Sequence, residues 1–549
     1  MTATLVKLSD EYSRMAAAVP GAYWDKERQA VVLDPQEHPR GAAVALRLFP
    51  ALAAQLQPYQ QADTYPRPIN FATPYYENYG GQLNLSPELR DMLYQHQKED
   101  LTYGVDFLAQ NGAIYYAWDM GLGKTLAAIA SWMHLDCKTV MVVSSNAAKQ
   151  SVWAADIAKW AVLNGTPYQT YDFGGTKGQR EGELRDMDNE RYPRKVLLVH
   201  YQALRLLPPG LEFDMVVFDE AHRLANAGPS QGKGVPQFFK ALAKVKSTYR
   251  VALSGSVINN DARDLFGAQH WMLPRTYPSR WRSWNNRYLD FIDNPVAGKV
   301  FIGIQPGKTE ELRKEIGAFT LVRNKSDELP DLPDKLHTDY YVDLSPRQRK
   351  VYNDMLTRTI AELPDGTTLS SVNVLDQLTK LRRITSGLDA LSEAVNDSTK
   401  FDLAINLIED NFPGKSVVFT WHRDVAYAFQ RRLDDLGISS LIITGDVPAK
   451  KRSPLIEEFQ TEDYPRVMIG TMATIGESVT LHRANNVIFL EMSWVPRDMD
   501  QAQDRVHRIG QTGHVSVANI MAKDTIDVQR LLPAVLTKDN LRRALLGKG

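Results

Sequence analysis

Short apolar runs that alternate with helical segments restrict this chain to a small set of folds. A first set of runs is TVMVVSS, KVLLVHY, DMVVFDE and YRVALSG, at 139–145, 195–201, 214–220 and 249–255. A second set is KSVVFTW, SSLIITGD, RVMIGTM and NNVIFLEMS, at 415–421, 439–446, 466–472 and 485–493. Continuous apolar strands separated by helices are typical of parallel sheets covered on both faces. The sequence therefore predicts an α/β protein with two parallel-sheet lobes.

The length of the chain and the spacing of these runs suggest a division into five segments. At 549 residues the chain is too long for one ordinary core. We expect two lobes at 88–260 and 401–525, and a mostly helical segment between them at 261–400. A small N-terminal accessory domain with its connector at 1–87 and a C-terminal helical tail at 526–549 complete the division.

Composition excludes several classes of protein. The single cysteine, Cys137, rules out an internal disulfide framework and zinc modules, which need several cysteines. We interpret Cys137 as a buried structural residue. The N-terminus has no apolar signal core, and no run of 18 apolar residues could span a bilayer. We therefore expect a folded protein in a reducing, aqueous compartment, without a membrane partner.

The segment GAIYYAWDMGLGKTLAAIASWMHL (112–135) predicts a strand, a glycine-rich loop and a helix. Gly121 and Gly123 permit a backbone that wraps phosphate oxygens at a helix N-terminus. Lys124 would reach the β- and γ-phosphates, and the Thr125 hydroxyl would bind magnesium. The usual phosphate-loop pattern has glycine where this sequence has Trp118, so the loop alone leaves the nucleotide site undecided.

Two further groups supply the chemistry that ATP hydrolysis needs. Asp219 and Glu220 follow an apolar strand, where Asp219 can hold magnesium and Glu220 can orient and deprotonate the attacking water. The alternative for two adjacent acids is a solvated strand end. Arg505 and Arg508 are three residues apart in QAQDRVHRIGQ and can neutralise charge in the transition state. Arginines from the second lobe would make hydrolysis depend on lobe closure.

With these residues the chain resembles the Swi/Snf family of superfamily 2 helicase-like ATPases over about residues 88–525. LYQHQ is similar to the adenine-recognising Q motif with Gln97, and WDMGLGKT resembles motif I with Leu122 among its nucleotide contacts. DEAH, LSGSVINN, VVFTWHRDVAYAFQRRL, GTMATIGESVTLHRANNVIFLEMSWVP and QAQDRVHRIGQ resemble motifs II to VI. The resemblance implies two RecA-like domains with helical insertions, ATP and Mg²⁺ as cofactors, and Gly476 of motif V near the nucleotide.

Some positions depart from the family pattern. Trp118 and Asp119 stand where the family commonly has Asp-Glu, and motif III has Ser256-Val257 for Thr-Pro. Motif V reads Gly476-Glu477-Ser478 where a second glycine is usual. Because none of these changes removes a residue assigned to the chemistry, we expect ATPase activity, although its coupling to DNA could differ.

The resemblance also implies a nucleic-acid substrate, typically double-stranded DNA followed along one strand. Tracking needs contacts with the phosphate backbone rather than with bases. The candidates by motif position are Ser144, Ser145, His200, Tyr201, Trp421, His422 and Thr471. For Trp421, a packing role after a strand is an equal alternative. SRWRSWNNRYLD (279–290) suits a polyanion groove or an aromatic core face, and we favour the core.

The N-terminal stretch 12–34 resembles the small HARP-like module of annealing helicases, with a turn followed by the strand AVVLD. An unrelated domain capping the first lobe is the alternative. We expect an ATP-driven translocase on double-stranded or branched DNA, acting as a monomer, in the cytoplasm of a bacterial or phage-infected cell. A strand-separating DNA or RNA helicase, a non-catalytic clamp, and the motor subunit of a restriction or defence complex are the alternatives.

Overall fold

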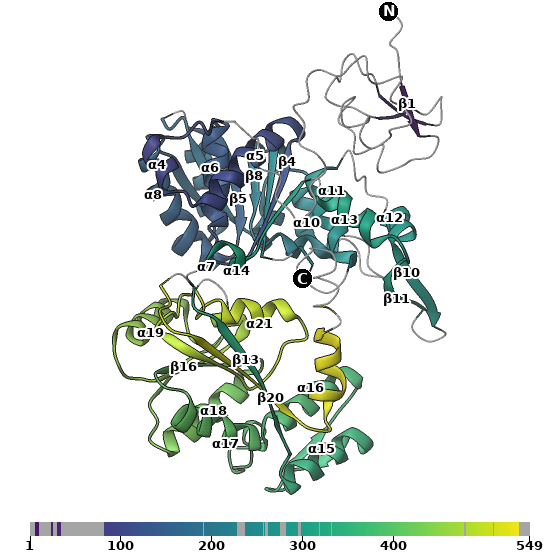
Figure 1. Cartoon of the computed structure of the whole chain (residues 1–549), viewed down its shortest axis with the longest axis vertical. Helices are drawn as coiled ribbons and strands as arrows, with labels where there is room; N and C mark the ends of the chain where they lie inside the picture. The colour runs from purple at the N-terminus through teal and green to yellow at the C-terminus, as the bar shows by residue number, and fades with distance from the viewer. Residues whose placement is uncertain are drawn as a thin grey trace, which may run out of the picture. The chain divides into compact units, whose positions relative to one another are not determined.

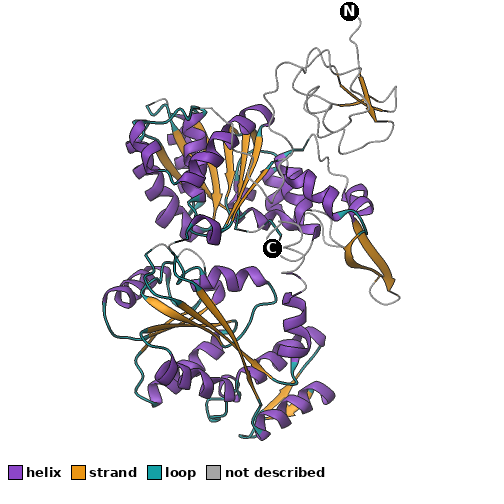
Figure 2. Ribbon diagram, viewed as in Figure 1, coloured by secondary structure: helices purple, strands orange, loops and turns teal. Residues whose placement is uncertain are grey.

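This computed structural model divides into two compact units, Met1–Asn324 with Leu541–Gly549, and Lys325–Asn540. It describes residues 6–9, 23–25, 30–33 and most of 82–538, with gaps at 190, 228–236, 256, 259–261, 275–280, 295–297, 318, 331, 477–478, 509 and 537. Each unit is built around its own parallel sheet, whose strands are orange in Figure 2. Within the described ranges, no helix is long and apolar enough to cross a membrane.

The first unit contains a seven-stranded parallel sheet in the order β12-β4-β9-β8-β5-β7-β6. Its strands are β4 (Ala113–Trp118), β5 (Thr139–Ser144), β6 (Gln169–Phe173), β7 (Lys195–His200), β8 (Glu212–Phe218), β9 (Lys246–Leu253) and β12 (Thr320–Arg323). The strand β4 leads into GLGKT and β8 leads into Asp219, and β9 lies between them. Parallel strands end at a common edge, so this order brings both motifs to one edge of the sheet.

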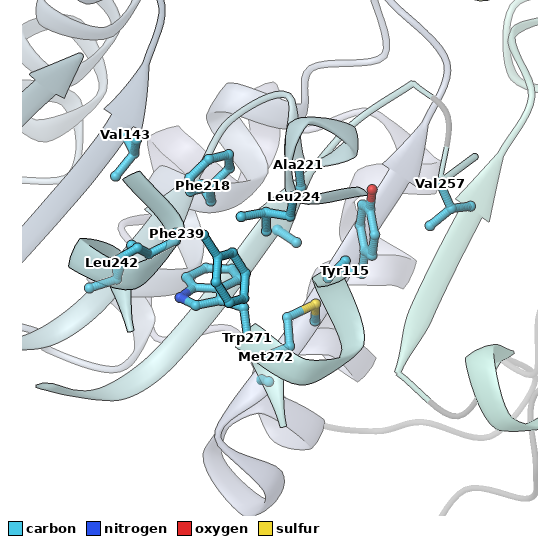
Figure 3. Packing of buried hydrophobic residues seen from close by; sticks show 14 of the residues in the cluster. Tyr115, Val143, Phe218, Ala221, Leu224, Phe239, Leu242, Val257, Trp271 and Met272 are labelled. Carbon is cyan, nitrogen blue, oxygen red and sulfur yellow. The ribbon is translucent and has the colours of Figure 1, made fainter. Parts of the chain in front are cut away.

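Helices lie on both faces of this sheet (Figure 1), and successive side chains of a strand point to opposite faces. Tyr116 and Trp118 of β4 contact α6 (Lys124–His134) and α5 (Gln95–Asn111), through Ser131 and His96 respectively. Tyr115 of β4 belongs instead to the core formed with α10 (Gln237–Leu242) and α11 (Leu265–Met272), part of which Figure 3 shows. The sheet is therefore covered on both faces, as the sequence predicts.

The aromatic residues of 281–288 belong to this same core. Trp284 and Tyr288 of α12 (Trp281–Tyr288) are fully buried. The Trp284 indole N–H donates to Gln269 Oε1 at 3.1 Å, and the Tyr288 hydroxyl donates to Glu315 Oε1 at 2.5 Å. These contacts confirm the interpretation of the segment as an aromatic core face rather than a polyanion groove. The hairpin of β10 (Leu289–Asn294) and β11 (Gly298–Ile304) follows, and α13 (Thr309–Gly317) leads to β12.

The second unit contains a six-stranded parallel sheet in the order β13-β20-β19-β16-β18-β17. Its strands are β13 (Lys335–Val342), β16 (Lys415–Thr420), β17 (Ser440–Ile443), β18 (Val467–Thr471), β19 (Ala484–Phe489) and β20 (Val515–Ala522). Val418 packs with α17 (Thr399–Asn406) and α18 (Arg423–Asp435), and Phe419 faces the core that includes α19 (Ala449–Thr461) and α21 (Pro496–Gln503). Both faces of this sheet are thus covered as well. The helices α15 (Pro346–Arg358) and α16 (Val374–Ser386) pack on each other beside it.

The segment 261–400 contains more strand than the sequence suggested. It supplies the edge strands of both main sheets, β12 and β13, and the hairpins β10-β11 and β14-β15, the latter formed by Ile360–Glu362 and Thr368–Ser370. The boundary between the two units lies inside it, at Asn324 and Lys325. These strands escape a search for apolar runs because β12 has four residues and β13, KLHTDYYV, is an edge strand with mostly exposed residues.

The N-terminal region is described only in part. The strands β1 (Val6–Ser9), β2 (Tyr23–Asp25) and β3 (Ala30–Leu33) form an antiparallel sheet in the order β1-β3-β2, and β3 is the strand expected at AVVLD. The rest of 1–81 and the end of the C-terminal tail lie outside the described residues. The likeness to a HARP-like module therefore stays a prediction.

Replacement of Arg323 with leucine tests the attachment of β12 to the first unit. The Arg323 guanidinium donates to Asp100 Oδ1 at 2.7 and 3.0 Å and to Glu99 Oε2 at 2.9 Å, and Asp100 is completely buried. Loss of this partner from a buried carboxylate should lower the free energy of unfolding by about 3 kcal/mol or more. Urea denaturation followed by circular dichroism measures the change. Lys177→Met removes an exposed ion pair with Glu181 and should change stability by less than about 1 kcal/mol; equal losses in the two variants would contradict the expectation.

Candidate nucleotide-binding site

The loop between β4 and α6 has the backbone that phosphate binding requires. Gly121 and Gly123 have φ angles of +89° and +83°, in the left-handed region that favours glycine. Gly123 is the N-cap of α6, which begins at Lys124 and places Thr125 in its first turn. The Lys124 ammonium donates to the carbonyl oxygens of Trp118 at 2.8 Å and Asp119 at 3.1 Å. A lysine that closes over a glycine loop at a helix N-terminus is suited to bind phosphate.

Two side chains of α5 hold this loop at one atom. Gln97 Nε2 donates to the carbonyl oxygen of Leu122 at 3.0 Å, and His96 Nε2 lies 3.1 Å from the same oxygen. Gln97 Oε1 accepts from the amide of Tyr94, and Gln97 is almost fully buried. A Cβ atom on Gly123 would lie 2.2 Å from Gln97 Nε2. Glycine is therefore required here for two reasons: it allows the left-handed turn, and it leaves room for the side chain of Gln97.

Trp118 packs inside the first unit, against His96 and Tyr116. Its side chain is fully buried at the end of β4, and its ring meets His96 edge-on at 5.6 Å and Tyr116 at 5.2 Å between centroids. His96 in turn contacts the Leu122 carbonyl. The side chain of Trp118 thus supports the loop through His96, and its main-chain carbonyl accepts a hydrogen bond from Lys124.

The carboxylates of the DEAH motif lie at the end of β8. Asp219 Oδ1 accepts the amide of Glu220 at 2.9 Å, and Asp219 Oδ2 accepts the indole N–H of Trp153 at 3.1 Å. Burial and the neighbouring Glu220 raise the pKa of Asp219 to about 6, while Trp153 and Lys124 act in the opposite direction. A buried carboxylate beside a second one would be stabilised by a cation, and oxygen ligands suit Mg²⁺. The donor chemistry therefore fits the magnesium site expected at Asp219.

Glu220 has a strained backbone and its own neighbours. Its φ angle of +51° is unusual for a residue other than glycine, and such strain concentrates at functional sites. Glu220 Oε2 lies 3.2 Å from His222 Nδ1, which also lies 3.2 Å from the hydroxyl of Ser254 in motif III. Motifs II and III are thus connected through one imidazole.

The sequence interpretation did not single out Trp153, His96, His222 or Ser254 for this site. Trp153 lies in the π-helix Lys149–Ala154, directly after motif Ia, and its ring stacks on Trp132. A tryptophan in an apolar stretch carries no signal for a hydrogen bond to a distant carboxylate, because indole rings are common in cores.

In the second unit, motifs V and VI are joined by the predicted arginines. Arg505 Nε donates to the carbonyl of Gly476 at 2.9 Å, and Arg508 Nη1 donates to the hydroxyl of Thr480 at 2.8 Å. Gly476 is the C-cap of α20 (Met472–Ile475). Ser256, Glu477 and Ser478, where the sequence departs from the family pattern, lie outside the described residues.

The residues predicted to contact DNA differ in how far their side chains are buried. The side chains of Ser144, Tyr201 and Thr471 are buried, and the Tyr201 hydroxyl donates to the carbonyl of Asp219 at 3.0 Å. Ser145 caps a helix by accepting from the amide of Ala148, and His200 accepts from the amide of Gln202. Burial or these hydrogen bonds give the five residues local structural roles, and a DNA contact by any of them stays a prediction.

Trp421 is the exposed member of the group. Its side chain is 40% exposed, and the guanidinium of the buried Arg382 lies 5.5 Å from the centre of its ring. Glu491 Oε2 accepts the amides of both Trp421 and His422 at 2.8 Å, and Glu491 Oε1 lies 2.7 Å from His422 Nδ1. Hydrogen bonds from His422 and the charge of Arg382 lower the pKa of the buried Glu491 to about 2, against the effect of burial. The ring is thus partly packed near Arg382 and partly exposed, and a DNA contact by Trp421 or His422 stays a prediction beside the packing alternative.

Comparison with known families identifies the chain. The model of the SNF2-related domain matches residues 94–390, more than half of the chain, and the model of the helicase conserved C-terminal domain matches 399–510. The chain belongs to the SNF2-related, or Swi/Snf, family. The resemblance read from the motifs is confirmed, as is the fold of two RecA-like lobes with helical insertions.

Relatives of this SNF2-related chain occur in bacteria and in animals. An "Uncharacterized ATP-dependent helicase" of Mycoplasma pneumoniae is 28% identical over 74% of this chain and 38% of its own length. The human "DNA annealing helicase and endonuclease ZRANB3" is 24% identical over 81% of this chain and 40% of its own. The "Putative ATP-dependent helicase/translocase YwqA" of Bacillus subtilis is 24% identical over 81% and 48%. The chain thus spans less than half of the length of these curated relatives.

Among solved structures, the "Sulfolobus solfataricus SWI2/SNF2 ATPase core in complex with dsDNA" matches 85% of this chain and 96% of its own. Its sequence identity is 24% and its TM-score is 0.40.

Replacement of Gly123 with alanine should damage nucleotide binding more than stability. A Cβ atom at this left-handed residue must displace Gln97 from the Leu122 carbonyl. We expect at least a tenfold higher Kd for a fluorescent ATP analogue, equal to about 1.4 kcal/mol. Gly165→Ala is the matched control, because Gly165 has φ +68° with nothing within 4 Å of its Cβ position. Similar Kd values for the two variants would contradict the expectation, because Gly123→Ala would then bind the nucleotide as well as a variant with no change near Gln97.

Proposed function

We propose that this chain is an ATP-driven translocase on double-stranded DNA, in which two RecA-like units couple ATP hydrolysis to movement. The observation that carries the proposal is the meeting of motifs I and II in the first unit. Lys124 and the carboxylates Asp219 and Glu220 come from the ends of β4 and β8, and Lys124 acts on the pKa of Asp219. Names of relatives such as YwqA and ZRANB3 support a helicase-like motor that acts on DNA.

Each residue has a role that follows from its position. The loop amides around Gly121 and Gly123 bind the phosphates, and Lys124 exchanges its two carbonyl partners for phosphate oxygens. Asp219 and Thr125 would hold Mg²⁺, which neutralises charge on the phosphates when it is bound. Glu220 orients the attacking water and takes its proton. Arg505 and Arg508 come from the second unit and stabilise the charge of the transition state.

The DNA surface is proposed to include Trp421, because an exposed aromatic ring can stack on nucleotides and the nearby Arg382 is cationic. Fork remodelling or strand annealing is the finer form of the proposal, and the name of the human relative favours it. A strand-separating helicase and a motor subunit of a restriction or defence complex are the competing functions.

Removal of single groups from the first unit should separate binding from hydrolysis. Lys124→Ala should lose both, because it removes the phosphate cation, whereas Glu220→Gln should bind ATP but hydrolyse it at least about 100-fold more slowly. Phosphate release and binding of a fluorescent ATP analogue measure the two properties. Glu212→Gln, an exposed position at the start of the same strand β8, serves as the control and should retain activity. Turnover near the wild-type rate in either site variant would refute the assignment.

The substrate class is tested by stimulation of the ATPase. Duplex or forked DNA should raise kcat far more than RNA does, and the effect should weaken as salt rises, because phosphate contacts release counterions. One assay with duplex DNA, single-stranded DNA, forked DNA and RNA distinguishes the functions. Strongest stimulation by RNA would exclude the proposed substrate, and strongest stimulation by single strands would favour a strand-separating helicase.

A further inference from the structure

The first residues of the second unit contact the segment that carries Arg505 and Arg508. Lys325 Nζ lies 2.8 Å from Asp504 Oδ1 and donates to the carbonyl of His507 at 3.1 Å. His507 Nε2 lies 2.6 Å from the carbonyl of Pro333, and Lys335 Nζ lies 3.6 Å from Asp504 Oδ1. All of these contacts lie within the unit Lys325–Asn540. Residues 325–335 therefore hold residues 504–507 at several points.

The contact of Lys325 is the one best protected from water. Its side chain is 8% exposed and that of Asp504 is 11% exposed, whereas the side chain of Lys335 is 26% exposed. A buried pair resists rearrangement, because separating it leaves a charge without its partner in a medium of low polarity. Lys325 also binds a main-chain carbonyl, so it fixes the backbone of motif VI as well as one side chain.

The arginines depend on that backbone. Asp504 directly precedes Arg505, and His507 directly precedes Arg508. The Arg505 carbonyl accepts the amide of Leu481 at 2.7 Å, and its side chain reaches the carbonyl of Gly476. A shift at Asp504 or His507 would therefore move both guanidinium groups away from their partners in motif V.

Two residues before Lys325, the chain is fixed to the first unit. Arg323 is bound to Glu99 and Asp100 of α5, the helix that also supplies His96 and Gln97 to the nucleotide loop. The carbonyl of Arg323 accepts the amide of Asp119 at 2.9 Å. Two residues of backbone span at most about 7 Å. One residue, Asn324, thus separates an anchor in the nucleotide-binding unit from an anchor in the arginine-bearing unit.

We propose that Lys325 is a positioning residue for ATP hydrolysis, which fixes Arg505 and Arg508 to the peptide that joins the two units. The proposal rests on the proposed function, since it requires these arginines to act on ATP. Rotation of the backbone at Asn324 is then passed to motif VI through a buried ion pair. Because its partners are Asp504 and the carbonyl of His507 in motif VI, loss of Lys325 should change the rate of the chemical step and leave ATP binding intact.

The alternative is that Lys325 only stabilises the second unit. Lys400 offers a matched control for this alternative. Its ammonium lies 2.7 Å from Asp527, donates to the carbonyl of Leu490 at 3.1 Å and is almost fully buried, in the same unit. Lys400→Met removes an ion pair of the same chemistry and similar burial. Lys400 is not among the residues that the contacts above place against Asp504 and His507.

The experiment compares Lys325→Met, Lys400→Met and Arg505→Gln in the full chain. It measures kcat and KM with saturating duplex DNA, and the Kd of a fluorescent ATP analogue at a temperature where circular dichroism shows all three folded. We expect Lys325→Met to lower kcat by about 100-fold, the effect of a misplacement near 1 Å, with KM and Kd unchanged. Lys400→Met should keep a kcat close to that of the wild type, and Lys325→Arg should recover part of the loss.

A wild-type kcat in Lys325→Met, or the same loss in Lys400→Met, would overturn the proposal. If Lys325→Met does not fold, Asp504→Asn replaces it, because the amide keeps the shape of the carboxylate. The same selective loss of kcat is expected for Asp504→Asn. A wild-type kcat in that variant overturns the proposal. A wild-type kcat in Arg505→Gln would instead refute the proposed function, so the two failures are distinguishable.

Discussion

The carbonyl oxygen of Leu122 is the atom on which the nucleotide loop depends. It accepts a hydrogen bond from Gln97 and lies within hydrogen-bonding distance of His96, and both residues belong to α5. These contacts hold a loop whose glycines have left-handed backbones. The lysine that follows is then aimed over the loop at the start of α6. Helix α5 is itself bound to β12 by Arg323, so the loop, the sheet edge and the end of the first unit form one continuous set of contacts.

This arrangement explains the residue that sets the sequence apart from the usual phosphate loop. Trp118 fills the space behind His96, where a buried aromatic ring provides a large contact area at a fixed orientation. A carboxylate in this buried position of the present chain would lose its hydration at a high cost. The substitution therefore alters the support of the loop and leaves Lys124, Asp219 and Glu220 in place.

Much of this fold follows from the sequence because buried parallel strands are continuous apolar runs. The strands around 139–145, 195–201 and 415–421 begin where predicted and end one residue earlier. The edge strands β12 and β13 could not be found in this way, since one is short and the other is largely exposed.

The residues of motifs I, II and VI were assigned from their spacing, and the comparisons establish the family but leave each residue's role as a prediction. Trp153 and Lys325 were missed because their partners, Asp219 and Asp504, are distant in sequence and pairing is fixed only by the folded backbone.

In the proposed function, the first unit binds ATP and the second supplies the charge needed to hydrolyse it. ATP binding and hydrolysis measured on the same samples of Arg508→Gln, with saturating duplex DNA, test it directly. We expect a Kd for ATP close to that of the wild type, with hydrolysis reduced by about 1000-fold, as for loss of an arginine finger. Hydrolysis near the wild-type rate, or a loss of binding that equals the loss of hydrolysis, would contradict it.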